Sequence, residues 1–450
     1  MSKCNTITTE LGSQESEATF AIPEWGAELE KALVRMGQEL DLEQTARESG
    51  ALVRRRGVGS ASDLLRIVLG YSVLDWSLRL LGAWCVVLGL ADISKTALRN
   101  RLRRCGVWLG KLVVQMLLQQ KVLFPPQAHL RIRLVDASVI SQPGSRGTDW
   151  RLHLGFDLGC SGLDWVEVTD AQGGESLTRF RWGPGELCIA DRGYAVRKDV
   201  GHVLSSAAWL IVRIGWSKLP LEQGNGQAFD LIAWLKQVSP DPTAAAREAA
   251  VWVTTPQGRF AVRLIARAIP PQAAEEARRR LRKASAKHGR TIDDRSLLAA
   301  GFVILVTNLP ASGWEAEQVL QFYRFRWQVE LYFRRLKSLL QLDQLRAKDP
   351  QLAQVYLLGK LLGALLINHI QHRLARAYPH WFSAQERPLS LWRLTALLWD
   401  EVRHLIRGPI TLSAILAVFP RLRRFLCDEP RKRVCQRAFA LTLLNGLCGF

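Results

Sequence analysis

The sequence predicts an α/β core that a mostly β insertion interrupts and that helical regions flank at both ends. Three observations predict this class. Apolar residues recur at every third or fourth position over 24–120 and again beyond residue 352, as in amphipathic helices. Over about 130–216 they alternate or form short runs between turn residues, as in strands. A segment of about 80 residues, 217–300, separates this part from a return of the core pattern.

Composition indicates a polyanionic partner. The 450 residues include 61 Lys and Arg against 41 Asp and Glu, which gives a net charge of +20 and a pI near 10.1. Such an excess favours nucleic acid or an anionic membrane surface. The longest clean apolar runs, such as 80–91, fall short of the ~20 residues that span a bilayer, so no membrane span is expected.

The start of the chain argues against a secreted protein, and the cysteines argue against a zinc-binding or disulfide-stabilised one. Residues 1–20 lack the basic start and apolar stretch of a secretory signal, so a cytoplasmic location is expected. Eight cysteines are scattered without a C-x-x-C pair, which argues against a zinc site and against a disulfide framework.

The helical N-terminal part contains a basic segment that resembles a helix-turn-helix. In LADISKTALRNRLRRCG, Ser94 can cap a second helix, and no acidic residue occurs between Asp92 and Asp136. We expect this helix to bind DNA through its cations, which are Lys95, Arg99, Arg101, Arg103 and Arg104. The alternative is a basic helical linker without a function.

The middle of the chain predicts a sheet. Three consecutive strands are expected at 130–140, 149–159 and 163–175, in a meander. A short buried strand follows in GELCIADRGY and another in AWLIVRIG. The segment 217–300 adds strand-like pieces and the strongly basic helix AAEEARRRLRKASAKHGR.

One charged, aromatic segment, FYRFRWQVELYFRRLK at 322–337, carries a single acid among five cations. Ser312 and Glu315 predict a capping box at the start of its helix, and the KDP at 348–350 predicts its end. At 100° per residue, one stripe about 60° wide holds four side chains, which are Tyr323, Arg326, Glu330 and Lys337. The stripe is complementary to a phosphodiester beside a metal ion, whereas the plain alternative is a solvated helix with an i,i+4 ion pair. Trp327 is expected to pack against the sheet.

A carboxylate that binds metal needs acidic partners on rigid elements. Asp136 and Asp191 each follow a buried apolar run, where an unpaired charge is costly unless a metal or another charge compensates it. Other acids, such as Asp157 and Asp164, alternate with apolar residues and are expected to face outward.

Together these motifs resemble a known family. VDAS at 135–138, ADRGY at 190–194 and the spacing Y-x2-R-x3-E-x6-K at 323–337 resemble the DDE transposases of bacterial insertion sequences, specifically the insertion-sequence-four family. The resemblance covers about 130–345, and its last motif is highly specific. Ala137 departs from it, because many relatives have Gly after the first Asp.

The resemblance implies an RNase H-like core and a domain plan. The expected regions are a disordered tail at 1–22, a helical DNA-binding domain at 23–125, a catalytic core at 126–216 and 300–348, an insertion domain at 217–299 and a helical C-terminal region at 349–450. In the family an aromatic residue of the insertion can stack on a displaced base, and Phe302 or Trp314 are the candidates here.

The resemblance also implies the site and its chemistry. Asp136, Asp191 and Glu330 are the expected catalytic and metal-binding residues, and the expected contacts to DNA in the core come from Tyr323, Arg326, Lys337 and Arg192. The expected cofactor is magnesium, for which manganese can substitute, with two ions roughly 3.5 to 4 Å apart. Water would first free a 3′ hydroxyl at the element's end, and that hydroxyl would then attack target DNA; a hairpin at the excised end is also expected.

The expected partners are double-stranded DNA of the transposon ends and of the target, and a second copy in a homodimer. We expect the protein in the bacterial cytoplasm, at the nucleoid when bound to DNA, and not at a membrane. Two alternatives stay open at this point. One is a catalytically silent or domesticated DNA-binding protein derived from a transposase, and the other is an RNase H-like nuclease that cleaves without joining.

Overall fold

The computed structural model describes residues 41–427 and 442–444, except 56, 124–129, 146, 160–161, 288, 290 and 384–388. The tail expected at 1–22, the helix expected at 24–40 and most of the basic C-terminal end lie outside the described residues.

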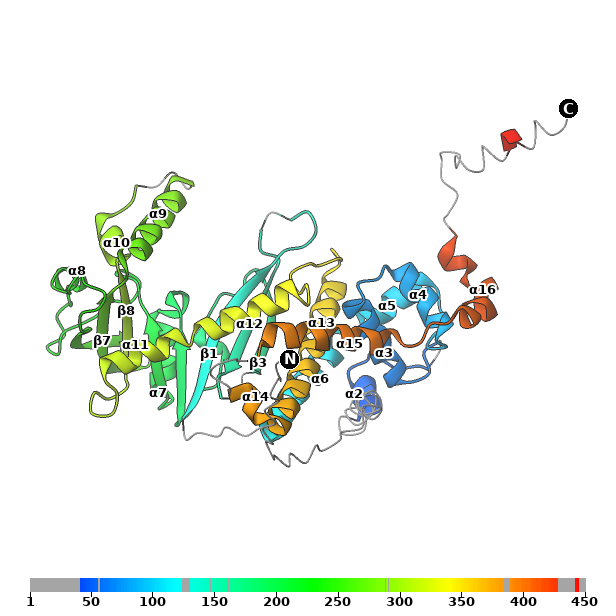
Figure 1. Ribbon diagram of the computed structural model, residues 1–450, viewed down its shortest axis with the longest axis horizontal. Coiled ribbons are helices and arrows are strands. Elements are labelled where there is room, and N and C mark those ends of the chain that lie inside the picture. The colour runs from blue at the N-terminus through cyan, green and yellow to red at the C-terminus, as the bar shows by residue number, and fades with distance from the viewer. Residues whose placement is uncertain are drawn as a thin grey trace, which may run out of the picture.

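An eight-stranded mixed sheet runs through one half of the molecule, in the order β3-β2-β1-β4-β5-β8-β7-β6 (Figure 1). Only the β1–β4 and β4–β5 pairs are parallel. The strands are β1 (Arg131–Ile140), β2 (Trp150–Asp157), β3 (Gly162–Asp170), β4 (Glu186–Ala190), β5 (Trp209–Arg213), β6 (Arg247–Thr255), β7 (Gly258–Ala268) and β8 (Phe302–Thr307).

The predicted meander is confirmed, because β1, β2 and β3 pair antiparallel in sequence order. The segment 217–299 differs from its prediction. Its strands β6 and β7 pair with β8 and so extend the core sheet. It also contains α8 (Leu231–Leu235), α9 (Pro271–Lys287) and α10 (Asp294–Ala299), so it is mixed rather than mostly β.

Helices cover both faces of the parallel part of the sheet. One face packs against α7 (Arg197–Ser205), and the other carries α11 (Ala316–Arg324) and α12 (Trp327–Ser338). Because side chains alternate along a strand, Leu134 belongs to the apolar core on the α12 side, and Val135 to the core on the α7 side.

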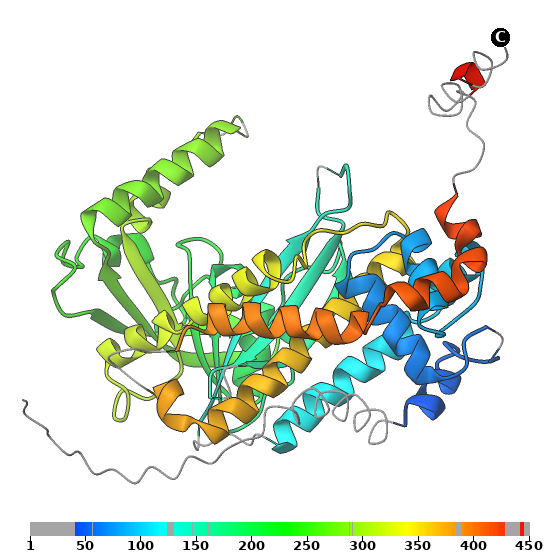
Figure 2. The same ribbon diagram turned by 45° about the vertical axis from the view of Figure 1, so that its right-hand side comes forward.

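The first and last parts of the chain form one helical body beside the sheet (Figure 2). Arg66 and Trp84 in the first part donate hydrogen bonds to the carbonyls of Ile406 and Arg407 in the last, at 3.2 and 2.9 Å. The helices are α2 (Leu42–Glu48), α3 (Ala61–Val73), α4 (Leu78–Val87), α5 (Lys95–Arg103) and α6 (Gly106–Leu123), followed by α13 (Pro350–Ala377), α14 (Pro379–Ser383), α15 (Leu391–Arg407) and α16 (Leu412–Leu426). Ser94 caps α5 as predicted, because its hydroxyl accepts from the backbone N–H of Ala97.

The long helix α13 is the centre of this body. By length and composition it could cross a membrane, contrary to the expectation from the apolar runs, but 83% of its most apolar stretch is buried inside the protein. It packs against α3, α6 and α15, and is therefore a core helix.

A buried lysine joins α13 to the loop after α12. The Lys360 ammonium is fully buried, donates to the carbonyls of Leu340 and Gln341 at 2.7 and 3.0 Å, and lies 3.3 Å from a carboxylate oxygen of Asp75. Burial lowers the pKa of Lys360 to about 8, although Asp75 opposes that shift. This contact connects the helical body to the segment that ends α12.

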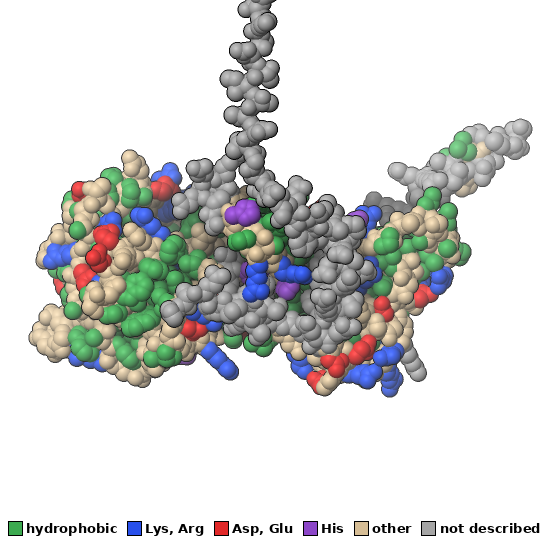
Figure 3. All heavy atoms as spheres, turned by 60° about the horizontal axis from the view of Figure 1, so that its bottom comes forward, with side chains coloured by type: hydrophobic (Ala, Val, Ile, Leu, Met, Phe, Trp, Pro, Cys, Tyr) green, Lys and Arg blue, Asp and Glu red, His purple; other side chains and the backbone are tan. Residues whose placement is uncertain are grey.

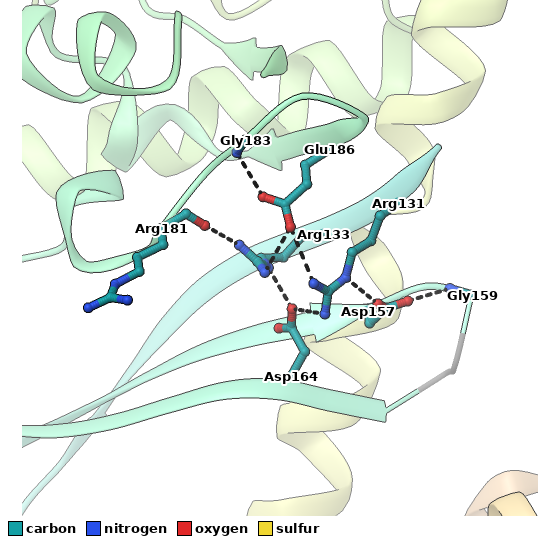
Figure 4. A network of polar contacts seen from close by, with 8 residues as sticks. All are labelled: Arg131, Arg133, Asp157, Gly159, Asp164, Arg181, Gly183 and Glu186. Atoms are coloured by element: carbon teal, nitrogen blue, oxygen red, sulfur yellow. Dashed lines mark hydrogen bonds and ion pairs between the residues drawn. The ribbon is translucent and has the colours of Figure 1, made fainter. Parts of the chain in front are cut away.

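A buried ion network fixes the start of β1 against its neighbours (Figure 4). The Arg131 guanidinium pairs with Asp157, Asp164 and Glu186 at 2.7, 2.8 and 3.2 Å. Arg133 pairs with Asp164 at 2.6 Å and with Glu186 at 3.3 Å. Asp157 and Asp164 are buried, so the expectation that they face outward was wrong: their partners lie on β1, which their own strands do not reveal.

We expect Arg133→Met to lower the free energy of unfolding by about 3 to 5 kcal/mol, because it leaves the buried Asp164 carboxylate with one fewer partner. Urea denaturation measures the loss. The matched control is Arg179→Met, whose 2.8 Å pair with Glu167 is more exposed and should cost below about 1 kcal/mol. Equal losses in both variants would contradict the role given to the network.

Candidate active site

The parallel pairing of β1 and β4 brings Asp136 and Asp191 together. Leu134 on β1 lies opposite Ile189 on β4; Asp136 comes two residues further along β1, and Asp191 comes two residues after Ile189, directly after β4 ends at Ala190. The two carboxylates therefore lie at the same level, on the same face as Leu134 and Ile189, which is the face that α12 covers.

Helix α12 brings Glu330 to this face. Val329, Tyr332, Phe333 and Leu336 are buried under α12, and the Tyr332 ring packs on Phe156 of β2 with centroids 5.4 Å apart. Glu330 lies at the margin of the buried face, with its side chain 34% exposed.

Asp191 and Glu330 both act on the titration of Asp136. Burial raises the pKa of Asp136 to about 6, the hydrogen bond from the Ala137 N–H and the charge of Arg326 oppose this, and Glu330 and Asp191 raise the pKa further. A carboxylate whose pKa responds to two others lies within short electrostatic range of both.

Asp191 titrates in the opposite direction. Burial alone would raise its pKa, but the Arg192 backbone N–H, Arg326, Arg213 and the Tyr323 hydroxyl together hold it below the ordinary value. Tyr323 donates to Asp191 Oδ1 at 3.1 Å. The two aspartates thus differ in pKa because Arg213 and the Tyr323 hydroxyl act on Asp191 in addition to a backbone N–H and Arg326, whereas Asp136 has only a backbone N–H and Arg326.

Arg326 lies at the centre of the cluster. Its guanidinium pairs with Glu330 at 2.7 Å, and it acts electrostatically on Asp136 and on Asp191. Burial disfavours its charge, but Tyr323, Asp191 and Glu330 raise its pKa overall. Its Nε is buried and has no hydrogen-bond partner among the described residues, so this N–H is an unsatisfied donor.

The segment that carries these residues is two helices and not one. α11 ends at Arg324 and α12 begins at Trp327. Between them, the N–H groups of Phe325, Arg326 and Val329 bond to carbonyls three residues earlier. The capping box is Glu315 with Gln318 rather than Ser312 with Glu315, and α12 ends at Ser338, before the predicted stop at 348–350.

The structure brings together only part of the predicted stripe. Tyr323, Arg326 and Glu330 form contacts with one another or with Asp191, whereas among the described residues Lys337 has no hydrogen bond or ion pair to them. Arg192 is exposed directly after Asp191. Arg213, at the end of β5, was missed because nothing in its own strand marks it as a neighbour of Asp191.

Three aromatic residues lie differently from their predictions or candidate roles. Phe302 is buried in the core of β8 and has no free face for a base. Trp314 is half-buried and packs edge-on against Phe322, with centroids 5.0 Å apart. Trp327 is 57% exposed beside Arg326, so the expectation that it packs against the sheet was wrong.

The donor set fits magnesium in its chemistry, because carboxylate oxygens are the ligands that this ion prefers. Yet within the described ranges no group of three or more His, Cys, Asp or Glu side chains is close enough together to hold a metal ion. Glu330 is paired instead with the Arg326 guanidinium at 2.7 Å.

The predicted DNA-binding cations in and directly after α5 divide into an exposed group and a group with partners in the protein, to which Arg101 also belongs because it donates to the carbonyl of Arg54 at 3.3 Å. Lys95 and Arg104 are exposed. Arg99 and Arg103 pair with Asp349 at 3.1 and 3.3 Å, and so hold α5 against the start of α13. Next to them an open cavity of about 640 Å³ is lined by polar side chains that include Asn100, Arg103, Arg104, Gln351 and Gln354.

Asp136→Asn should stabilise the metal-free protein at neutral pH. Since the folded-state pKa of about 6 lies above the ordinary 3.8, stability falls as pH rises through the interval from about 4 to 6, and Asn avoids that loss. The expected gain at pH 7 is up to about 3 kcal/mol, and it should vanish below about pH 4. Thermal unfolding in EDTA across this range measures it.

Asp191→Asn is the matched comparison. The pKa of Asp191 is lowered on folding, so its ionised form stabilises the folded protein, and the substitution should reduce the stability at pH 7. If both variants moved stability in the same direction, the electrostatic description of the cluster would be wrong.

Comparison with known proteins adds three findings. A family model described as a transposase DDE domain matches residues 128–367. A transposase for the insertion sequence element IS421 from Escherichia coli is 38% identical over 345 residues, which is 75% of this chain and 92% of that protein. A transposase for the element IS231F from Bacillus thuringiensis subsp. israelensis is 26% identical over 436 residues, covering 87% of this chain and 89% of that one.

Among solved structures, the cryo-EM structure of the piggyBac transposase synaptic complex with hairpin DNA overlaps with a TM-score of 0.42 and 9% identity. The overlap covers 83% of this chain and 78% of that one.

Proposed function

The chain belongs to the family of transposases with a DDE domain, and from this membership we propose that it binds the terminal repeats of an insertion sequence and catalyses metal-dependent cleavage and strand transfer of that DNA. The single observation that carries the proposal is the level placement of Asp136 and Asp191 on adjacent parallel strands, under the helix that bears Glu330.

Asp136, Asp191 and Glu330 are assigned as the ligands of magnesium, or of manganese in its place. When bound, the two ions supply Lewis-acid activation of the attacking oxygen and stabilisation of the leaving oxygen. Support comes from the raised pKa of Asp136, which burial causes first and the nearby carboxylates of Glu330 and Asp191 add to; a bound cation would favour the ionised form.

Arg326 is assigned to the phosphate at the reacting strand. Its buried Nε has no partner among the described residues, and a guanidinium can donate to two phosphate oxygens at once. Metal binding would compensate the charge of Glu330 and free the rest of the guanidinium for DNA. Tyr323 is only 9% exposed and donates to Asp191, so its role is to position that carboxylate.

Contacts to the DNA duplex are assigned to cations that solvent can reach. Arg192, which is exposed, and Lys337, which is half-buried, are assigned beside the site, and Lys95 and Arg104 on the helical body are exposed, where they can neutralise phosphates. Arg99 and Arg103 instead orient α5 through Asp349. The open cavity beside Arg104 is suited to the backbone of the end duplex, because amide and guanidinium donors line it.

The proposal extends to the type of core, the subgroup of the family, the oligomeric state and the location in the cell. The strand order β3-β2-β1-β4-β5 with its antiparallel meander supports an RNase H-like core, and the spacing from Tyr323 to Lys337 supports the insertion-sequence-four group and its Tyr-Arg-Glu-Lys signature. Two ends must be joined, so the working form is a homodimer on double-stranded DNA. Its place is the bacterial cytoplasm, at the nucleoid.

Replacing the assigned ligand tests the proposal. Purified protein is incubated with Mg²⁺ and a labelled duplex that carries the terminal repeat, and cleavage is followed on a denaturing gel. Glu330→Gln should reduce the cleavage rate by roughly 10³-fold or more, as expected for loss of a group that acts as part of a catalytic unit.

The chain offers a close control. Glu167 is 35% exposed and pairs with Arg179 at 2.8 Å, as Glu330 is 34% exposed and pairs with Arg326 at 2.7 Å. Glu167→Gln should therefore leave cleavage unchanged. Equal cleavage by wild type and Glu330→Gln would refute the assigned site, and cleavage without joining would favour a plain nuclease.

A further inference from the structure

A basic helix projects from the sheet and takes no part in the site described above. In Figures 1 and 2, α9 rises away from β7 and β8 into open space. Of its 17 residues only Ala274 is buried. A helix without an apolar face does not contribute to a core, and its stability has to come from local ion pairs or from a partner.

Its charges exceed what local pairing requires. Glu275 and Glu276 pair with arginines further along the helix, at distances between 2.5 and 3.7 Å. Residues 277–287 contain no acid and six cations, which are Arg278, Arg279, Arg280, Arg282, Lys283 and Lys287. Two carboxylates therefore face six cations, and Lys283 and Lys287 are in no ion pair with a described residue.

One arginine attaches the helix and the others face outward. Arg278 Nε donates to the carbonyl of Leu297 in α10 at 3.2 Å. At 100° per residue the remaining five cations fall within a sector of roughly 160°. Arg279 and Arg280 are 74% and 77% exposed. The base of α9 is thus fixed, while a broad cationic face is left for a polyanion.

Sheet topology places this face at the edge where the reaction is proposed to occur. β8 is antiparallel to β5, and β7 is antiparallel to β8, so β7 runs in the same direction as β5, β4 and β1. The carboxyl ends of these strands lie at one edge of the sheet, and α9 begins three residues after β7 ends. The turn after β1 projects to the same side as α9 in both views.

The described residues on the lower side of Figure 1 form no such surface. Figure 3 turns that side toward the viewer, and over the described residues visible there, Lys and Arg are scattered among Asp and Glu. Compared with those residues, α9 offers a duplex the more continuous cationic face.

From these observations, and resting on the proposed function, we infer that α9 is an arm that holds the phosphate backbone of the target DNA during strand transfer. The helical body and α9 lie on opposite sides of the strands that carry Asp136 and Asp191 (Figure 1). An end duplex that runs from the helical body to those residues terminates there, so the DNA that α9 meets lies beyond the terminus. Lysine and arginine contacts to phosphates carry no sequence information, which suits a target of variable sequence.

The arm is about 26 Å long at 1.5 Å per residue, so it can follow the backbone across a groove about 12 Å wide. Neutralising Lys283 and Lys287 should remove two phosphate contacts without disturbing the attachment through Arg278 or the pairs of Glu275 and Glu276.

The test separates the two chemical steps in the full-length protein. Lys283→Gln/Lys287→Gln is compared with wild type in cleavage of the end duplex, and in joining of a pre-cleaved end duplex to a supercoiled plasmid. Joining should fall on the order of tenfold while cleavage stays within about twofold, and the salt dependence of binding to a random-sequence duplex should become shallower by roughly 1.8 in log–log slope. The control is Arg197→Gln/Lys198→Gln, which removes two exposed cations from α7 on the lower side of Figure 1 and should change neither step.

Each other outcome overturns the inference. An equal loss of cleavage and joining would show that α9 contacts the end duplex or its flank. If neither joining nor the salt dependence of binding changed, α9 would be a solvated helix that does not bind DNA. Failure of the wild type to cleave would instead refute the proposed function. Binding to the random-sequence duplex, which needs no catalysis, would still decide whether the arm holds DNA.

Discussion

The parallel pairing of β1 with β4 is the constraint on which the rest of the structure depends. It sets Asp136 and Asp191 at one level and on one face, and α12 brings Glu330 to that face because its own apolar side chains pack there. A slip of one residue in either strand would turn its aspartate toward the α7 face. The buried network of Arg131, Arg133 and their carboxylate partners spans β1, β2, β3 and the start of β4, and holds this register.

A cluster of three carboxylates next to an apolar core is electrostatically unfavourable, and Arg326 reduces the cost. The guanidinium pairs with Glu330 and acts on both aspartates. The guanidinium therefore supplies a positive charge to the carboxylates in the absence of a metal ion. The buried ammonium of Lys360 links the end of α12 to Asp75 in the helical body, so the part of the chain proposed to bind DNA ends is mechanically connected to the helix of Glu330.

Much of the core could be predicted from the sequence, because the alternation of apolar and polar residues along a strand and an acidic residue directly after an apolar run are both local signals. The strands from β1 to β5 and the Ser94 cap were predicted on that basis. The convergence of Asp136, Asp191 and Glu330 on one metal site stays a prediction: Glu330 and Asp191 act electrostatically on Asp136, but within the described residues no three such side chains are close enough together to hold a metal ion. The features that were missed depend on partners far apart in the chain. Asp164 is buried because β1 supplies its arginines, and Arg103 is occupied because Asp349 lies 246 residues away. The break between α11 and α12 was missed because Phe325 and Arg326 keep helical dihedral angles without the regular hydrogen bonds.

The central claim is that three carboxylates bind metal at one place and that Arg326 gives up Glu330 when they do. Anomalous diffraction from crystals that contain Mn²⁺ tests it most directly. The account predicts manganese peaks in contact with the carboxylates of Asp136, Asp191 and Glu330, with the Arg326 guanidinium no longer paired to Glu330. Manganese bound elsewhere, or an Arg326 to Glu330 pair that persists beside the bound ions, would contradict it.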